Sequence, residues 1–307
     1  MQRQKIITVV GASNVDITGF SNEKLIYQDA NIGTMKTSVG GVGRNIAENL
    51  LRLGFTINLI SVFGDDPLSK YLIKSCKDIE LTIENSLFLQ NASASTFLAT
   101  MDENNDLAVG ISAMDIYDQI DNEFILSRIP IINRSDYVVL ETNMPENILQ
   151  LIADNVIEAK LVLDTVSGVK ALKAKNILSK LYILKTNLIE AQMLSGMEVT
   201  ESKDYDKLVS FFLDQGVQNV FITLGKEGVV FGNKEIIKTH KPIRTKVTNT
   251  IGAGDSFVSG LIYGDSKAYS IEEVARYGMA SASINVQHDS AVSPEMNLVN
   301  LAKIINK

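Results

Sequence analysis

The chain has 307 residues and is 45% hydrophobic, which is enough to bury a large core in one or two domains. Its 29 basic and 36 acidic residues give a formal net charge of −7 without a basic run, which argues against nucleic-acid or membrane binding. The single cysteine, Cys76, excludes an internal disulfide framework, and the distant His240 and His288 argue against a histidine-based metal site. We expect a cytoplasmic protein, because no signal peptide precedes the first predicted strand and no apolar run reaches about 18 residues.

Predicted strands and helices alternate along most of the chain. The strands lie at 5–10, 56–62, 137–140, 160–163, 182–184 and 220–224. The helices lie at 46–53, 67–76, 145–156, 168–178, 188–194 and 203–214. A late hairpin at 229–231 and 235–238 and helices at 253–263, 271–286 and 297–305 complete the chain. This βαβ order predicts a mostly parallel sheet that is covered by helices on both faces.

Two segments, 17–38 and 93–113, do not follow this alternation. Both favour β-structure, because polar and apolar residues alternate in them and long helical patterns are missing. The residues alone leave open whether these segments are edge hairpins of the main sheet or a separate small sheet.

A glycine-rich turn precedes the predicted helix at 253–263. Gly252-Ala253-Gly254 lets the backbone approach a ligand closely, and the helix directs its positive end to the same place. Asp255 follows at once, so the motif combines an anion cradle with a carboxylate. This combination suits phosphoryl transfer, in which the amides bind negative charge and Asp255 accepts the proton of an attacking hydroxyl. Gly-x-Gly-Asp is also common in ordinary turns, so the motif needs support from elsewhere in the chain.

A second glycine-rich element, Gly40-Gly41-Val42-Gly43-Arg44-Asn45, precedes the helix at 46–53. It lacks Gly-x-Gly-x-x-Gly spacing, as does the segment at 11–14, and the chain contains no Gly-x-x-x-x-Gly-Lys-Ser/Thr P-loop. These patterns argue against a dinucleotide-dependent oxidoreductase. By itself the element could be a close helix–strand packing turn.

Together, these motifs resemble the signatures of the ribokinase-like carbohydrate kinases, the PfkB family. The segment 40–53 is similar to the N-terminal signature of the family, and 249–255 is similar to the C-terminal one. Asn187-Leu188-Ile189-Glu190 resembles its Asn-x-x-Glu motif, and Ile222-Thr223-Leu224-Gly225, with Gly228, resembles its phosphate strand. The four motifs occur in the order typical of the family.

This resemblance implies a ribokinase-like α/β fold with a mostly parallel sheet, helices on both faces and a small β-sheet lid. Residues 1–16, 39–92 and 114–307 would form the catalytic domain, and 17–38 and 93–113 the lid. The lid would project over the substrate and pair with the lid of a second subunit, giving a homodimer.

Further segments resemble the pseudouridine kinases of this family, namely 41–50, 114–118, 143–146, 164–167 with Lys170, and 291–294. The implied activity is ATP-dependent phosphorylation of the 5′-hydroxyl of pseudouridine, and the alternative substrate is another ribonucleoside or a free sugar. An inactive sensing protein on the same fold is a further alternative, against which the intact 252–255 motif argues. Thr165 and Thr186 stand where that group usually has proline, and we expect this change to affect backbone stiffness rather than chemistry.

The resemblance assigns substrate-binding roles to Asn14, Asp16, Gly41, Asn45, Asn143 and Lys170. Asn14 and Asp16 follow the first strand, at the edge where open α/β sheets bind ligands, and a carboxylate can accept from both hydroxyls of a ribose diol. Ordinary alternatives are a turn for Asn14 and Asp16 and a solvated helix position for Lys170. Asp115 and Ser38 are the candidate acceptors for the base.

On the nucleotide side, the resemblance places ATP at Asn187, Thr223, Gly225 and Gly228. Glu190 lies three residues after Asn187 on one predicted helix, so both side chains could order Mg²⁺ through its waters. The structural alternative is a first-turn glutamate that the helix dipole favours. Asn249 and Ile251 mark a possible monovalent-cation site for K⁺, where Asn249 replaces the aspartate that is common in the family.

Overall fold

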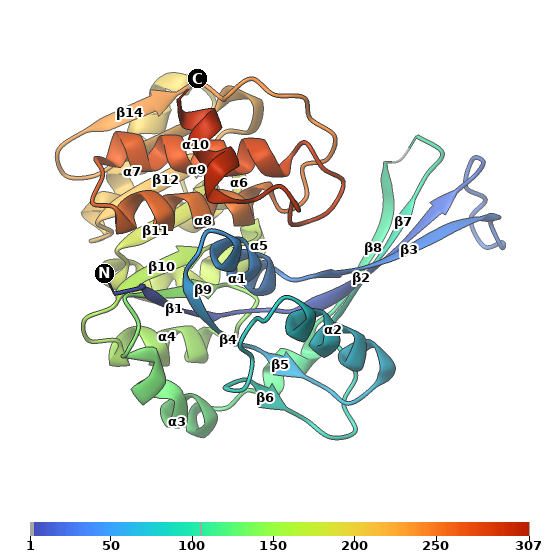
Figure 1. Ribbon diagram of the computed structural model, residues 1–307. Helices are drawn as coiled ribbons and strands as arrows, with labels where there is room; N and C mark the ends of the chain where they lie inside the picture. The colour runs from blue at the N-terminus through green and yellow to red at the C-terminus, as the bar shows by residue number, and fades with distance from the viewer. Residues whose placement is uncertain (1–2, 105, 307) are drawn as a thin grey trace.

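The chain folds around one large sheet (Figure 1). The computed structural model describes residues 3–104 and 106–306. Within these residues, eight strands form the sheet in the order β14-β13-β12-β11-β10-β9-β1-β4. Their bounds are β1 Ile6–Val10, β4 Thr56–Ile60, β9 Tyr137–Glu141, β10 Lys160–Asp164, β11 Ile183–Asn187, β12 Asn219–Thr223, β13 Val229–Gly232 and β14 Ile237–His240. The strands β1, β4 and β9 to β12 are parallel to one another, whereas β13 pairs antiparallel with both β12 and β14. The sheet is therefore mostly parallel, as predicted.

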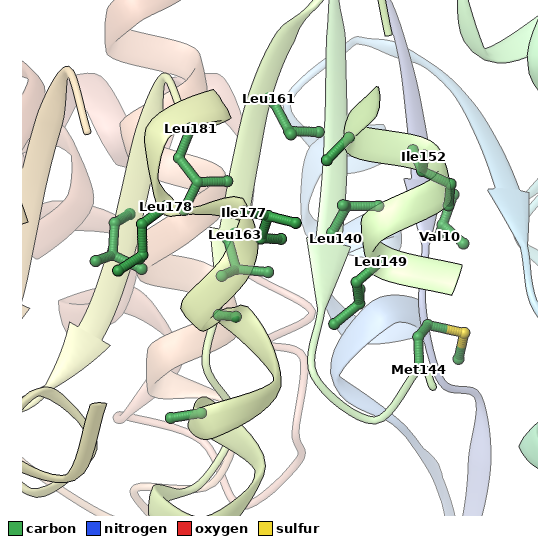
Figure 2. Close-up of a cluster of buried hydrophobic side chains, with 14 of the residues drawn as sticks. Val10, Leu140, Met144, Leu149, Ile152, Leu161, Leu163, Ile177, Leu178 and Leu181 are labelled. Atoms are coloured by element: carbon green, nitrogen blue, oxygen red, sulfur yellow. The ribbon is translucent and has the colours of Figure 1, made fainter. Parts of the chain in front are cut away.

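Helices cover both faces of this sheet (Figure 1). The hydrophobic cluster on one face includes side chains of α3 (Asn122–Ile132), α4 (Glu146–Asn155), α5 (Gly168–Ala171), α6 (Leu188–Ser195) and α7 (Tyr205–Asp214). The cluster on the other face includes side chains of α1 (Val42–Arg52), α2 (Pro67–Asp78), α8 (Ala253–Ser266), α9 (Ile271–Asn285) and α10 (Leu298–Ile305). Successive strand residues belong to opposite clusters: Leu140 and Leu163 lie in the first (Figure 2), and Val139 and Val162 in the second. The strands are therefore apolar at nearly every position.

A second, smaller sheet projects from the main body (Figure 1). In the part of the chain that the structure describes, it has four strands in the order β3 (Gly33–Gly40), β2 (Asn14–Ser21), β7 (Thr96–Met101) and β8 (Leu107–Ala113). This sheet is separate from the main one, so the two irregular segments are not edge hairpins of the main sheet. It begins slightly before the predicted segment, because Asn14 already pairs with Gly40. The division of the chain into two domains stays a prediction.

Some element bounds differ from the prediction. Helix α1 begins at Val42 rather than at 46, because Gly41 adopts a φ of 98° that turns the chain directly from β3 into the helix. The predicted helix at 168–178 is α-helical only in α5 and continues as a 3-10 helix, Leu172–Lys180. The sequence does not predict α3, because its apolar residues do not gather on one side and Pro130 lies within it. Short strands β5 (Val62–Phe63) and β6 (Leu87–Phe88) also pair.

A membrane-spanning helix is not found among the described residues, since none of their helices is both long and apolar enough.

Candidate active site

The two glycine-rich motifs meet through a pair of buried side chains. Asn45, in the first turn of α1, donates from Nδ2 to Oδ2 of Asp255, in the first turn of α8, over 2.8 Å. Asn45 Oδ1 is buried and has no hydrogen-bond partner among the described residues. A buried acceptor without a donor is costly, so this oxygen is suited to receive a hydroxyl or N–H from a ligand.

The predicted anion cradle, Gly252-Ala253-Gly254, lies at the start of α8. Its N-cap, Gly252, has a φ of 73°, and a Cβ there would lie 1.9 Å from the Ala291 carbonyl oxygen. A Cβ on Gly254 would lie 2.6 Å from Lys185 Nζ, so this ammonium group lies against the same turn. The first amides of a helix lack intrahelical acceptors and carry the positive end of its dipole, so together with Lys185 they can bind an anion.

Asp255 has the electrostatic environment of a general base. Burial raises the pKa of Asp255 to about 7, and the nearby Asp164 adds to this rise, whereas Asn45 and Lys185 oppose it. A carboxylate with a pKa near neutrality accepts protons more readily than an ordinary aspartate while still being ionised in much of the population.

Three ionisable side chains lie in register on β9, β10 and β11, namely Glu141, Asp164 and Lys185. Glu141 and Asp164 end their strands, and Lys185 is the middle residue of β11. Each follows by two positions a residue that packs on the α8 face, so all three project to that face. Lys185 Nζ lies 2.9 Å from Asp164 Oδ2, and both groups are buried. Neither Lys185 nor Glu141 was predicted from the sequence; the signal that could have identified them is an ionisable residue within a buried strand.

Glu141 connects the ends of β1 and β9. Its Oε1 accepts from the Ala12 amide over 2.5 Å, and its Oε2 accepts from the backbone N and the Nδ2 of Asn143 over 2.9 and 2.6 Å. Burial raises the pKa of Glu141 to about 7, and these backbone hydrogen bonds oppose the rise. Glu141 therefore fixes the position of Asn143 relative to the loop after β1.

The predicted sugar-binding residues lie around this loop. Asn14 and Asp16 are on β2, not in a turn, and Asn14 Nδ2 donates to Asp16 Oδ1. Burial raises the pKa of Asp16 to about 6, although the Asn14 hydrogen bond and the positive charge of Arg44 oppose it. A Cβ on Gly41 would lie 2.4 Å from the Ala12 carbonyl oxygen, so this position requires glycine for close packing.

Lys170 is not a freely solvated helix lysine. Its Nζ donates to Asn143 Oδ1 over 2.5 Å and lies 3.6 Å from Met114 Sδ. The group is partly buried, and burial lowers the pKa of Lys170 from its ordinary value. Lys170 and Asn143 thus present a joint polar surface next to Glu141.

The residues predicted for ATP follow β11 and β12. Asn187 and Thr223 are register partners at the ends of these strands, and Thr223 Oγ1 donates to the Thr186 carbonyl over 3.3 Å. Gly228 has a φ of 107°, and a Cβ there would lie 1.9 Å from the His240 carbonyl oxygen. At Gly225 a Cβ would meet nothing within 4 Å, so the turn is open there.

The residues predicted for Mg²⁺ fit a hydrated ion rather than a directly bound one. Asn187 and Glu190 form a capping box at the start of α6, in which Glu190 Oε2 accepts from the Asn187 amide and Oε1 from Asn187 Nδ2. Glu190 is thus also a first-turn glutamate that caps α6, which is the structural role considered in the sequence analysis. No group of three or more His, Cys, Asp or Glu side chains within 3–104 and 106–306 is arranged to hold a metal. Asn187 and Glu190 can therefore bind the ion through water.

The residues predicted for a monovalent cation instead bond one another. Asn249 Oδ1 accepts from the Ile251 amide over 3.0 Å, and Asn249 Nδ2 donates to the Asp289 carbonyl over 3.2 Å. Asn285 Nδ2 donates to the Ile251 carbonyl over 2.9 Å. The Asn249 Oδ1 and Ile251 carbonyl oxygens each accept one hydrogen bond and keep a second lone pair, so a K⁺ site here stays a prediction.

A family model described as pfkB family carbohydrate kinase matches residues 4–297, so the chain belongs to this family. Over 306 residues it is 28% identical to a pseudouridine kinase of Escherichia coli (strain K12), which covers 99% of this chain and 98% of that protein. Over 312 residues it is 27% identical to a ribokinase of Haemophilus influenzae, covering 94% and 95% of the two chains. The structure of Arabidopsis thaliana ribokinase complexed with ribose and ATP matches with a TM-score of 0.87 at 20% identity, covering 99% and 100%.

Membership of this family makes the chain a sugar or nucleoside kinase that transfers a phosphoryl group from ATP to a hydroxyl of a small molecule. The fold predicted from the sequence is confirmed by the sheet order and by the likeness to ribokinase.

Proposed function

We propose that the chain phosphorylates the 5′-hydroxyl of pseudouridine with ATP. The observation that carries the proposal is that two pairs of side chains are both connected by hydrogen bonds to Ala12, in the loop after β1. In the Asn45–Asp255 pair, Asn45 lies on α1, whose Arg44 amide donates to the Ala12 carbonyl. The Asn143–Lys170 pair reaches the Ala12 amide through Glu141. One pair supplies a base for a hydroxyl, and the other supplies polar groups that a nucleobase can use.

In the proposed reaction, the primary hydroxyl of the substrate points at Asp255, which accepts its proton as the oxygen attacks the γ-phosphorus. Asn45 holds Oδ2 of this carboxylate, so Oδ1 is left for the hydroxyl. The amides at the start of α8 and the Lys185 ammonium stabilise charge on the transferring group. Of the amides of Ile251 to Gly254 that were predicted to form this cradle, those of Gly252 and Gly254 would serve directly, because the Ile251 amide donates to Asn249 Oδ1 and the Ala253 amide to the Thr250 carbonyl.

The ribose and the base would occupy opposite sides of the loop after β1. Asp16 and Asn14 would bind the ribose diol, and the unpaired Asn45 Oδ1 would accept from a substrate hydroxyl. Asn143 and Lys170 would face the base. Of the two earlier candidates for reading it, Ser38 is the register partner of Asp16, and Asp115 follows Met114, which contacts Lys170.

Mg²⁺, when bound with ATP, would neutralise charge on the phosphates. Asn187 and Glu190 would orient its water ligands, as their capping box leaves them fixed at the start of α6. Thr223 and the open turn at Gly225 would contact the nucleotide phosphates, with Gly228 keeping the turn tight.

The small sheet would act as a lid that excludes water during transfer and so suppresses hydrolysis of ATP. It exposes the large apolar side chains Met35, Leu98, Leu107, Val109 and Ile111. Exposed apolar groups of this kind mark interaction surfaces, and we propose that the small sheets of two subunits pair there. A cytoplasmic location stays a prediction.

The alternative function is phosphorylation of another ribonucleoside or of a free sugar, which the 27% identity with a ribokinase supports. In that case Lys170 and Asn143 would only stabilise Glu141 and the loop after β1. An inactive sensing protein is less well supported, because it would not need a buried carboxylate, its Asn45 partner and a lysine at one helix start.

The test is a substrate panel of pseudouridine, uridine, other ribonucleosides and ribose, each with purified protein and Mg-ATP. We expect pseudouridine to give the highest kcat/KM, with the product identified as the 5′-phosphate by ³¹P NMR. Equal or better turnover of uridine or ribose would overturn the substrate assignment. Absence of transfer to every acceptor would favour the sensing protein.

A further inference from the structure

Three threonines lie side by side at the carboxyl end of the main sheet. Thr142, Thr165 and Thr186 each follow by one position the register partners Glu141, Asp164 and Lys185. Thr186 lies on β11 and projects to the opposite face, where α6 packs, and Thr142 and Thr165 directly follow the ends of β9 and β10. All three are fully buried. Their hydroxyls need acceptors there, and one acceptor is a carboxylate.

Two of these threonines contact Glu190 of the Asn-x-x-Glu motif. Thr165 Oγ1 donates to Glu190 Oε2 over 2.5 Å. Thr186 Oγ1 lies 3.0 Å from Thr165 Oγ1 and 3.4 Å from Glu190 Oε2. A hydroxyl carries one hydrogen, so Thr165 donates over 2.5 Å to the carboxylate, and Thr186 can donate to the same oxygen over 3.4 Å.

These contacts correct the expectation that Thr165 and Thr186 affect only backbone stiffness. A proline at either position has no side-chain donor. With prolines there, the carboxylate would retain only the two hydrogen bonds from Asn187. The hydroxyls in this chain add a short, charge-assisted hydrogen bond to a buried group.

The two carboxylate oxygens of Glu190 are thereby made unequal. Oε2 accepts from Thr165, from the Asn187 amide and, at longer distance, from Thr186. Among the described contacts, Oε1 accepts only from Asn187 Nδ2. Oε1 is thus the oxygen with capacity left for a water ligand of a metal.

We propose that Thr165 and Thr186 are positioning residues that fix the Glu190 carboxylate so that Oε1 faces the hydrated Mg²⁺ of the nucleotide. The inference rests on the proposed role of Glu190 but not on the identity of the acceptor. Thr165 and Thr186 would act like the hydrogen-bond partners of metal ligands in other proteins, which orient the ligand that holds the ion.

The decisive variant is Thr165→Val, which keeps the β-branched shape and removes the hydroxyl. We expect the Mg²⁺ concentration for half-maximal activity to rise about 5- to 10-fold, near the lower end of the usual effect of such partners. The KM of the nucleoside and kcat at saturating Mg²⁺ should change less than about two-fold, because the variant leaves Asp255 and the sugar side untouched. Thr165→Ser should restore the Mg²⁺ dependence.

A second readout does not require turnover. Calorimetric titration with ADP, with and without Mg²⁺, should show that Thr165→Val weakens the Mg²⁺-dependent gain in affinity by a similar factor and leaves metal-free ADP binding unchanged. Thr186→Val should give a smaller effect, because the Thr186 hydroxyl lies 3.4 Å from Glu190 Oε2 and the Thr165 hydroxyl lies 2.5 Å from it.

The matched control is Thr142→Val. Thr142 lies in the same row, but its hydroxyl donates to the Thr165 carbonyl over 2.6 Å and not to Glu190. We expect normal Mg²⁺ dependence of activity and of ADP binding. If Thr165→Val lowers only the melting temperature, or if Thr142→Val changes the Mg²⁺ dependence equally, the inference is overturned. The activity assay can use whichever acceptor the panel favours and the ADP titration needs none, so failure of the pseudouridine assignment is distinguishable from failure of this inference.

Discussion

Asn45 Nδ2 and Asp255 Oδ2 share a 2.8 Å hydrogen bond, although 210 positions separate the two residues in the chain. The bond joins the first turns of α1 and α8 and leaves one carboxylate oxygen for a substrate proton. The other, oxygen-bearing end of the Asn45 amide still needs a donor, because the buried Asn45 Oδ1 lacks a hydrogen-bond partner among the described residues. A ligand hydroxyl would remove this cost.

We expect Asp255→Asn to lower kcat by about 10²- to 10⁴-fold, the usual contribution of a positioned general base. The variant keeps the size of the side chain, so ADP affinity and the circular dichroism spectrum should match those of the wild type. Steady-state kinetics with the preferred acceptor provide the measurement. Retention of more than about a tenth of wild-type kcat would show that another group takes the proton.

The raised pKa of Asp255 predicts opposite pH dependences for activity and stability. Activity needs the ionised base, so kcat/KM should rise with pH through about 7. The shift from 3.8 to about 7 stabilises the fold fully only below pH about 4, and this contribution is lost as the pH rises through about 7. Asp255→Asn should therefore raise the melting temperature at pH 8 and raise it less at pH 5. A gain that does not depend on pH would contradict this prediction.

Lys185→Met should lower kcat by about 10²- to 10³-fold, the range seen when one donor to a developing oxyanion is removed. Because Lys185 opposes the rise in the pKa of Asp255, the midpoint of the kcat/KM profile should also move to higher pH. The variant leaves Asp164 buried without its partner, which costs stability. Lys185→Met with Asp164→Asn serves as the control. It should regain the melting temperature without regaining kcat, and recovery of kcat would assign Lys185 a purely structural role.

Pseudouridine differs from uridine in an extra ring N–H, since its base is joined to ribose through carbon. A buried acceptor left unpaired by uridine costs about 1–3 kcal/mol, or roughly 5- to 150-fold in kcat/KM. Asn143 Oδ1, which already accepts from Lys170, has a second lone pair that would accept this N–H. We expect the preference in the wild type and its reduction in Lys170→Met, which removes the group that holds Asn143 Oδ1, measured by competition between the two nucleosides. Lys173→Met is the matched control, because Lys173 donates to the Met144 carbonyl near the same site. An equal loss of the pseudouridine preference in both variants would show that Lys170 has no specific role in recognising the base.

The amide contacts of Asn249 and Asn285 predict weak dependence on potassium. Rates in K⁺ and in tetramethylammonium should agree within about two-fold, because Asn285 already uses one of the two lone pairs of the Ile251 carbonyl oxygen. Asn285→Ala removes the hydrogen bond to the Ile251 carbonyl, so we expect this variant to lose activity and to regain part of it when K⁺ is added. Strong activation of the wild type by K⁺ would mean that a cation displaces these amides.

Local sequence patterns determined most of the fold and part of the site. Apolar runs at 5–10 and 137–140 and their helical connections define a buried parallel sheet, because such strands need cover on both faces. The 252–255 turn identified Asp255, since its spacing is itself the chemical signal. The sequence did not predict α3, whose apolar residues lack a clear helical face.

Only the tertiary structure decided the partners of these groups. In the sequence, Lys185 and Glu141 are single charges in buried strands, and strand register brings both into line with Asp164 and turns them toward α8. Thr165, directly after β10, contacts Glu190 of α6 on the other face, and this contact depends on how the two elements pack. Side-chain direction follows from local periodicity, but the identity of the neighbour depends on which strands and helices pack together.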